Sequence, residues 1–118
     1  MQGYNGVQYN ITCSTDDGRI ADWIAVQLRK HLGSNKISAR GICMGASLNA
    51  KVLTVIHDPV EIPPYKVLEL ARGFARRFGV EIMEADIVGD IPLEVLLACA
   101  GYALSVRRIR SGQIRMEN

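Results

Sequence analysis

Long apolar stretches are missing from this sequence, and none approaches the roughly 18 residues that a membrane-spanning helix requires. Residues 1–6 contain no basic region followed by an apolar run, so we expect no signal peptide. Only three cysteines are present, and no two of them form a CxxC pair. An odd number of widely spaced cysteines indicates reduced, mostly buried thiols, as in a cytoplasmic protein.

Other missing patterns exclude further classes of function. The sequence has no glycine-rich phosphate-binding motif, and no His, Cys and Asp residues stand at the spacing of a metal site, so we predict no metal. The net charge of +2 is too small to indicate nucleic-acid binding by itself. What is present is an ordinary globular composition, since 48% of the residues are hydrophobic, which suffices for one core. With no repeat and no linker, we predict a single domain over residues 1–118.

The first half of the chain predicts a strand, a helix and two more strands. Residues 7–12 are rich in β-branched and aromatic side chains, which is typical of a strand. Apolar residues recur at helical spacing over residues 16–32, between carboxylates at the start and basic residues followed by glycine at the end. Residues 36–46 and 51–57 predict two strands, joined by a hairpin turn at residues 47–49.

The second half predicts a helix, a strand and a shorter helix. Pro63 and Pro64 suit the first turn of a helix, whose apolar stripe ends at Phe78 before a glycine. Residues 80–87 predict the fourth strand. A third helix over residues 93–104 and a basic tail complete the chain.

The resulting order is β-α-β-β-α-β with an extra C-terminal helix, which is the split βαβ pattern. We therefore predict an α+β, ferredoxin-like fold, with an antiparallel sheet and both long helices on one face. Some ferredoxin-like domains bind RNA, but that mode needs aromatic side chains on the central strands. Tyr9 is the only aromatic residue there, so we predict no nucleic-acid partner.

The predicted strands carry apolar side chains on both faces. Leu53 and Val55 oppose Val52 and Ile56 in the third strand, and the other strands show a similar pattern. Leaving such a face in water forfeits about 25 cal/mol per Å² of apolar surface. We therefore expect a partner to cover the face that the helices leave open, most simply a second copy of the chain. The alternative is that the extra helix or the tail folds over it.

Two segments resemble a known family. The run Val7-Gln8-Tyr9-Asn10-Ile11, followed by the pairs Ile20-Ala21, Ile24-Ala25 and Leu28-Arg29, is similar to the opening of the C-terminal subdomain of glutamate formiminotransferases. The run Asp86-Ile87-Val88-Gly89-Asp90-Ile91-Pro92-Leu93-Glu94-Val95-Leu96-Leu97 resembles a later segment of the same subdomain. The resemblance extends from about Gly6 to Leu104.

The resemblance implies a function in one-carbon transfer. Enzymes of that family move a formimino group from N-formimino-glutamate to tetrahydrofolate, which lies between two ferredoxin-like subdomains. Their catalytic histidine lies in the N-terminal subdomain and has no counterpart in these 118 residues. We therefore expect a folate-type binding domain that is not catalytic alone, has no covalently bound cofactor and accepts tetrahydrofolate as substrate. Its partner would be a second copy or a separate chain like the N-terminal subdomain; the alternative is a regulatory or assembly domain that oligomerises through its sheet face.

Six residues are candidates for ligand binding. Asn10 lies within the family pattern and suits a pterin-like or amide group, and Asp86 suits an amino-pyrimidine edge. Arg40 suits an anionic tail, Thr54 lies on a strand expected to face the ligand, and Gly89 precedes a helix N-terminus that suits an anion. His57 is a candidate for ligand binding and the one candidate general base. For each of them the alternative is a structural role, such as a cap, a turn or a solvated charge.

Overall fold

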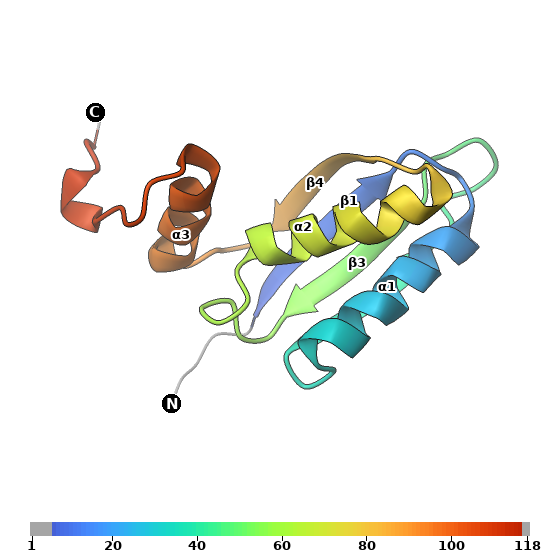
Figure 1. Ribbon diagram of the computed structural model, residues 1–118, viewed down its shortest axis with the longest axis horizontal. Coiled ribbons are helices and arrows are strands. Elements are labelled where there is room, and N and C mark those ends of the chain that lie inside the picture. Colours follow the sequence, from blue (N-terminus) through green and yellow to red (C-terminus); the bar gives the residue numbers. More distant parts are fainter. Residues whose placement is uncertain (1–5, 117–118) are drawn as a thin grey trace.

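The computed structural model describes residues 6–116, so the N-terminal residues from which we expect no signal peptide lie mostly outside it. The elements are β1 (Val7–Cys13), α1 (Gly18–Leu32), β2 (Ile37–Ile42), β3 (Lys51–Ile56), α2 (Pro64–Ala75), a 3₁₀ turn (Arg76–Phe78), β4 (Ile82–Val88), α3 (Leu93–Leu104) and a second 3₁₀ turn (Ser111–Gln113). The strands pair antiparallel in the order β2-β3-β1-β4. Figure 1 shows α1 and α2 on one face of this sheet, so the predicted α+β fold with a ferredoxin-like arrangement is confirmed.

The helix α1 follows from its local sequence. The side chain of Asp17 accepts a hydrogen bond from the backbone N–H of Arg19, with 2.9 Å between Oδ1 and N, which caps the first turn. A further hydrogen bond from the Arg19 side chain lowers the pKa of the Asp17 carboxyl. At the other end Gly33 has a φ of +100° and donates to the carbonyl of Arg29. The apolar stripe between these ends, which includes Ile24 and Leu28, is fully buried against the sheet.

The helix α1 lies very close to the edge strand β2. A Cβ atom added at Gly41 would lie only 2.1 Å from the backbone nitrogen of Asp22 and 2.4 Å from the carbonyl carbon of Ala21. Because backbone atoms of a helix cannot move aside singly, only glycine fits at this position. Gly41 therefore fixes how closely the helix approaches the strand, a role that the sequence did not reveal.

The strand β2 is shorter than expected, because the chain leaves the sheet after Ile42 instead of continuing to Ala46. The segment 43–50 forms a loop that is held by the end of β1. The backbone N–H of Ala50 donates to the carbonyl of Thr15 over 2.7 Å, and that of Ser47 donates to Asp16 Oδ2 over 3.3 Å. Ser47 has a φ of +65°. These contacts replace the short hairpin turn that we expected at residues 47–49.

The expectation of two apolar sheet faces is wrong for most of the sheet. In β1 and β2 the residues alternate between buried apolar side chains toward the helices and polar side chains away from them. In β4 the register places Ala85 opposite Ile11 and Ile87 opposite Tyr9, which puts both on the helix side. Thr12 pairs with Glu84 and Cys13 with Ile82, so a bulge shifts the alternation of β4 by one residue at this point. Ile82 therefore also lies on the helix side. The face without helices is consequently mixed, with more polar than apolar positions.

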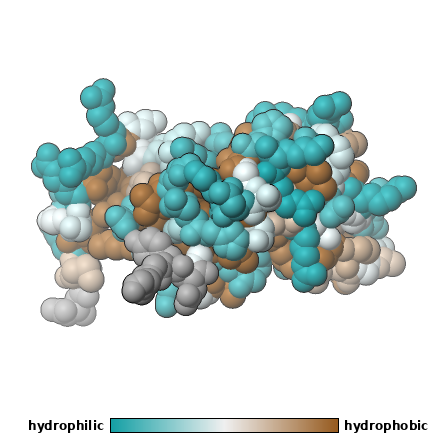
Figure 2. All heavy atoms as spheres, turned by 90° about the horizontal axis from the view of Figure 1, so that it is seen from below, coloured by the Kyte–Doolittle hydropathy of each residue, from teal (hydrophilic) through white to brown (hydrophobic). Residues whose placement is uncertain are grey.

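A group of exposed apolar side chains lies on α3. Figure 1 shows α3 at one end of the molecule, beyond the sheet, and Figure 2 shows hydrophobic surface at that end. The helix is tied to α2 by stacking of Tyr102 on Tyr65, with ring centroids 4.3 Å apart, and by a 3.0 Å hydrogen bond from the Tyr102 hydroxyl to Glu69. Its exposed large side chains are Leu93, Leu96, Tyr102 and Leu104. No helix in the described part of the chain is long and apolar enough to cross a membrane.

The three cysteines are free thiols in different surroundings. Cys13 is buried in the core and Cys99 is half-buried, and burial raises the pKa of both thiols. Cys43 is exposed in the loop after β2, so the expectation that the thiols are mostly buried does not extend to it.

Candidate ligand-binding face

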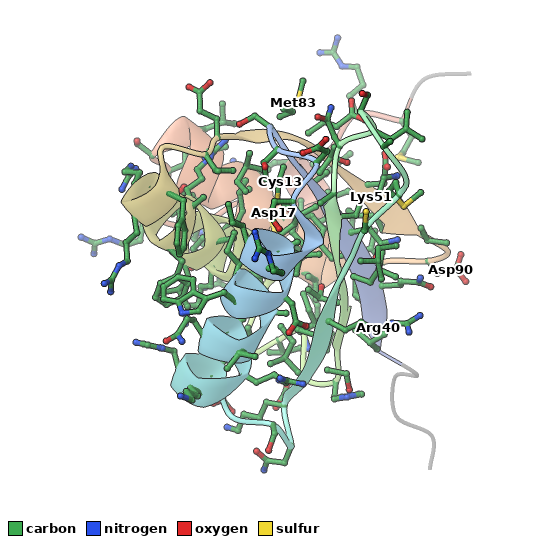
Figure 3. The ribbon with its side chains drawn as sticks, turned by 90° about the vertical axis from the view of Figure 1, so that its right-hand side faces the viewer. Cys13, Asp17, Arg40, Lys51, Met83 and Asp90 are labelled. Carbon is green, nitrogen blue, oxygen red and sulfur yellow. The ribbon has the colours of Figure 1, made fainter. Side chains whose placement is uncertain are left out.

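The face of the sheet opposite α1 and α2, hereafter the open face, has a regular layout. The pairing registers align its side chains in three rows that run across the four strands. From β2 through β3 and β1 to β4, the rows are Ser38-Val55-Gln8-Val88, Arg40-Leu53-Asn10-Asp86 and Ile42-Lys51-Thr12-Glu84. Basic side chains therefore lie on the β2–β3 half of the open face and acidic ones on β4. Figure 3 shows α1 on one side of the strands and Arg40 on the other.

The middle row brings together three of the six residues that the sequence predicted. Arg40 is paired with Leu53, Leu53 with Asn10, and Asn10 with Asp86. Neighbouring strands are about 4.8 Å apart, so the row spans about 14 Å from the guanidinium strand to the carboxylate strand. The order of its side chains is a cation, an apolar residue, an amide and an anion. A row of this kind suits an elongated ligand with an apolar middle and two different polar ends.

Asn10 is the most informative residue of the row. It lies on the central strand β1, and its side-chain oxygen Oδ1 is buried without a hydrogen-bond partner among the described residues. A buried polar atom without a partner forfeits about 1–3 kcal/mol, and such atoms are few in native structures. Asp86, its neighbour on β4, offers acceptors only, so the carboxylate cannot satisfy the amide oxygen. Asn10 therefore carries an unused hydrogen-bond acceptor on the central strand.

A pocket of about 440 Å³ adjoins the β2 end of this row. We call it the edge pocket. Its polar residues come from β1, α1, the turn after α1, β2 and β3. They include Arg29, which the sequence predicts only as a basic residue in the last turn of a helix. The edge pocket is lined by Gln8, Arg29, Ser34, Ile37, Ser38, Ala39, Arg40, Leu53, Thr54 and Val55. Ser38 precedes Arg40 by two residues on β2, so the alternation of a strand could have found it. Arg29 and Ser34 precede β2, and only the fold brings them to the pocket.

His57 lies at the rim of the open face and not in its centre. Its Nε2 is 2.7 Å from the hydroxyl oxygen of Ser38, and both residues are exposed. Asp58 does not pair with the ring, since its Oδ1 accepts a hydrogen bond from the backbone of Glu61 over 3.2 Å. The imidazole therefore has a hydroxyl partner and no carboxylate partner, which does not form the His–carboxylate arrangement of a general base.

Two further candidates lie outside the middle row. Thr54 lies on the helix side of β3, is 1% exposed, and its hydroxyl donates to the carbonyl of Tyr9. Its side chain therefore points away from the open face and is held by a hydrogen bond within the sheet, and its role in ligand binding stays a prediction. Gly89 follows β4 with a φ of +87° and lines a second shallow pocket, of about 590 Å³, beside Gln8 and Val88. It is thus next to the row Ser38-Val55-Gln8-Val88 but contributes no side chain.

A larger hollow lies elsewhere, between α3 and the basic tail. Its volume is about 960 Å³, and its walls include Leu93, Leu97 and Tyr102 together with Arg107 and Arg108. It contains none of the residues that the sequence predicted for a ligand. We place the candidate site on the open face because the buried, unpartnered oxygen of Asn10 lies there.

Two curated proteins are similar to this chain. A glutamate formimidoyltransferase of Thermoplasma acidophilum is 27% identical over 109 residues, which cover 92% of this chain and 36% of that protein. A glutamate formimidoyltransferase of Streptococcus pyogenes serotype M1 is 29% identical over 101 residues, which cover 85% of this chain and 34% of that protein. No protein-family model matches the chain. The chain thus spans about a third of the length of the curated relatives it matches, which agrees with the resemblance drawn from the sequence.

Proposed function

We propose that the open face binds a folate-type small molecule, and that the domain takes part in one-carbon transfer without catalysing it alone. The observation that carries this proposal is the buried, unpartnered oxygen of Asn10 next to the carboxylate of Asp86. A reduced pterin presents N–H donors and a carbonyl acceptor along one edge. Asp86 accepts from such donors, and the Asn10 amide both accepts and donates.

The apolar middle of the row supports the same ligand class. Leu53 lies beside Asn10 on β3, and Val55 lies beside Leu53 in the next row, so a flat ring placed there would cover apolar side chains that are now half-exposed. Similarity to glutamate formimidoyltransferases supports a role related to those enzymes. The position of His57 at the rim, bonded to Ser38, supports a binding role and not an independent catalytic one.

Binding of folates by the purified chain tests the proposal. We expect tetrahydrofolate and 5-formyl-tetrahydrofolate to bind saturably in calorimetric titrations and to raise the melting temperature. Asn10→Ala and Asp86→Asn each remove one hydrogen bond or charge and should weaken binding about tenfold, which corresponds to about 1.4 kcal/mol. Glu81→Gln, which removes a carboxylate outside the open face, should leave the affinity unchanged. Absence of binding by every folate at millimolar concentration would contradict the proposal.

We also propose that the domain works with a partner, for which a second copy of the chain is the simplest choice. The polar open face no longer supports a partner on that face, so the alternative of assembly through the sheet loses its physical basis. The exposed apolar residues of α3 and the threefold greater length of the relatives support a partner elsewhere.

Light scattering at micromolar concentration measures the association directly. We expect a dimer that Leu96→Glu converts to a monomer, because that change places a charge on the exposed side of α3. The matched variant Leu48→Glu, in the loop after β2, should remain a dimer. A monomeric wild-type chain would contradict self-association and would favour a separate partner chain.

A further inference from the structure

The charged residues that line the edge pocket are all basic. Arg29, in the last turn of α1, and Arg40, on the open face of β2, are both among the residues that line it. No aspartate or glutamate lines it. Among residues 6–116, neither arginine forms an ion pair with a carboxylate; the pairs present are Arg19–Asp17, Lys36–Glu61 and Arg72–Glu69. Two basic residues without a carboxylate partner make the hollow a favourable place for an anion.

The other polar groups of the edge pocket are suited to the same kind of ligand. Ser34 and Ser38 supply hydroxyl donors and Gln8 supplies an amide. His57 holds the hydroxyl of Ser38, since its Nε2 is 2.7 Å from Ser38 Oγ. When that nitrogen carries its proton and donates it to the serine oxygen, the hydroxyl hydrogen of Ser38 is free to point into the pocket. His57 then has a positioning role and not a catalytic one.

We infer that the edge pocket binds an oxyanion, a carboxylate or a phosphate, carried by a small-molecule ligand. Arginine presents a planar fork of donors that matches either group in a bidentate manner, and charge-assisted hydrogen bonds of this kind are about twice as strong as neutral ones. The volume of about 440 Å³ accommodates a group of this size with the first part of the ligand attached to it. Leu53 and Val55, which also line the pocket, would contact the apolar continuation of the ligand toward Asn10.

This inference deepens the proposed function and rests on it for the direction of the ligand, with its anionic end at β2 and its hydrogen-bonding end at β4. The anion site itself does not depend on folate. Any ligand that ends in a carboxylate or a phosphate meets the same arginine and serine donors, whatever its other end contains.

Titration of the ¹⁵N-labelled full chain with small anions, at constant ionic strength, tests the site. The probes are inorganic phosphate, L-glutamate and triglutamate, with L-glutamine as a probe that has one carboxylate fewer than glutamate. We expect saturable shifts of the backbone amides of residues 29, 34, 38 and 40. A stronger response to phosphate than to glutamate and triglutamate would assign a phosphate ligand, and the reverse order a carboxylate ligand.

Matched variants separate specific binding from general charge attraction. Arg29→Gln and Arg40→Gln should each weaken binding at least about tenfold, and Ser38→Ala a few-fold. Arg76→Gln removes an exposed arginine at the end of α2 and should have no effect. Equal losses for Arg76→Gln and Arg29→Gln, or no saturable shift at the edge pocket with any probe, would overturn the inference. Binding of phosphate or glutamate with no binding of folates would uphold the anion site and reject the proposed function. Folate binding that is insensitive to both arginine substitutions would uphold the proposed function and reject the anion site.

Discussion

The substitution Gly41→Ala lowers the free energy of unfolding by at least about 3 kcal/mol, because overpacking against immobile atoms is strongly destabilising. The added Cβ would lie 2.1 Å from the nitrogen of Asp22, and the atoms it meets are helix backbone and not the end of a flexible side chain. Relief requires that α1 move away from β2 as a unit, which opens the core around Ile24 and Leu28. Urea denaturation followed by circular dichroism measures the loss.

The same exchange at Gly73 is the control for Gly41→Ala and has the opposite expected sign. Gly73 lies inside α2, and a Cβ atom added there meets no atom within 4 Å. Alanine is a better helix former than glycine, so Gly73→Ala should stabilise the domain by about 0.5–1 kcal/mol. Equal and small effects of the two substitutions would mean that α1 and β2 are not in close contact at Gly41.

Truncation of Leu28 has the second largest expected effect. Its side chain is fully buried where α1 faces the sheet. A cavity would remain after Leu28→Ala, because the hydrogen bonds between the strands prevent the sheet from moving into the space. Such truncations cost about 2–5 kcal/mol. For a domain of this size, a loss of that order lowers the melting temperature by about 10 °C or more. Differential scanning calorimetry measures the shift.

Leu104→Ala is the chemically identical change on a different helix. Leu104 ends α3 and is 67% exposed, so its removal should alter the free energy of unfolding by less than about 0.5 kcal/mol. A large loss at Leu104 together with a small one at Leu28 would contradict the placement of the core between α1 and the sheet.

The elements that the sequence predicts well are the ones with local signals. The carboxylate at Asp17, the apolar spacing through Ile24 and Leu28 and the stop at Gly33 describe α1 almost completely, and the predicted third helix begins and ends where α3 does. Each of these signals lies within a few residues of the feature that it predicts. The order of the elements then limits the topology to very few arrangements.

Features that depend on pairing between distant segments could not be predicted from the sequence. The irregularity opposite Thr12 and Cys13, where Met83 of β4 has no partner in β1, puts Ile82 on the helix side, and the residues of β4 do not predict it. Residues 43–46 were expected to continue β2, but the backbone N–H groups of Ser47 and Ala50 donate to Asp16 and Thr15, and the segment 43–50 forms a loop.

The candidate site shows the same division. Asn10 and Asp86 are candidates through their chemistry alone, and only the register makes them neighbours. Thr54 is a candidate through its strand alone, because an apolar strand such as Lys51–Ile56 does not show by alternation which side is buried. Arg29 was missed because its position at the end of α1 already has a sufficient explanation, namely a favourable interaction with the helix dipole.

An antiparallel sheet of four strands that does not close has two free edges. The strand β4 forms one of these edges and carries acidic residues. Free edges invite pairing with the edges of other molecules, which leads to aggregation. Glu84 and Asp86 are both exposed along β4, so two molecules that approached edge to edge would bring like charges together. Removing both charges would therefore be expected to shorten the time for which concentrated solutions of the protein stay clear, even where its folding is unaffected.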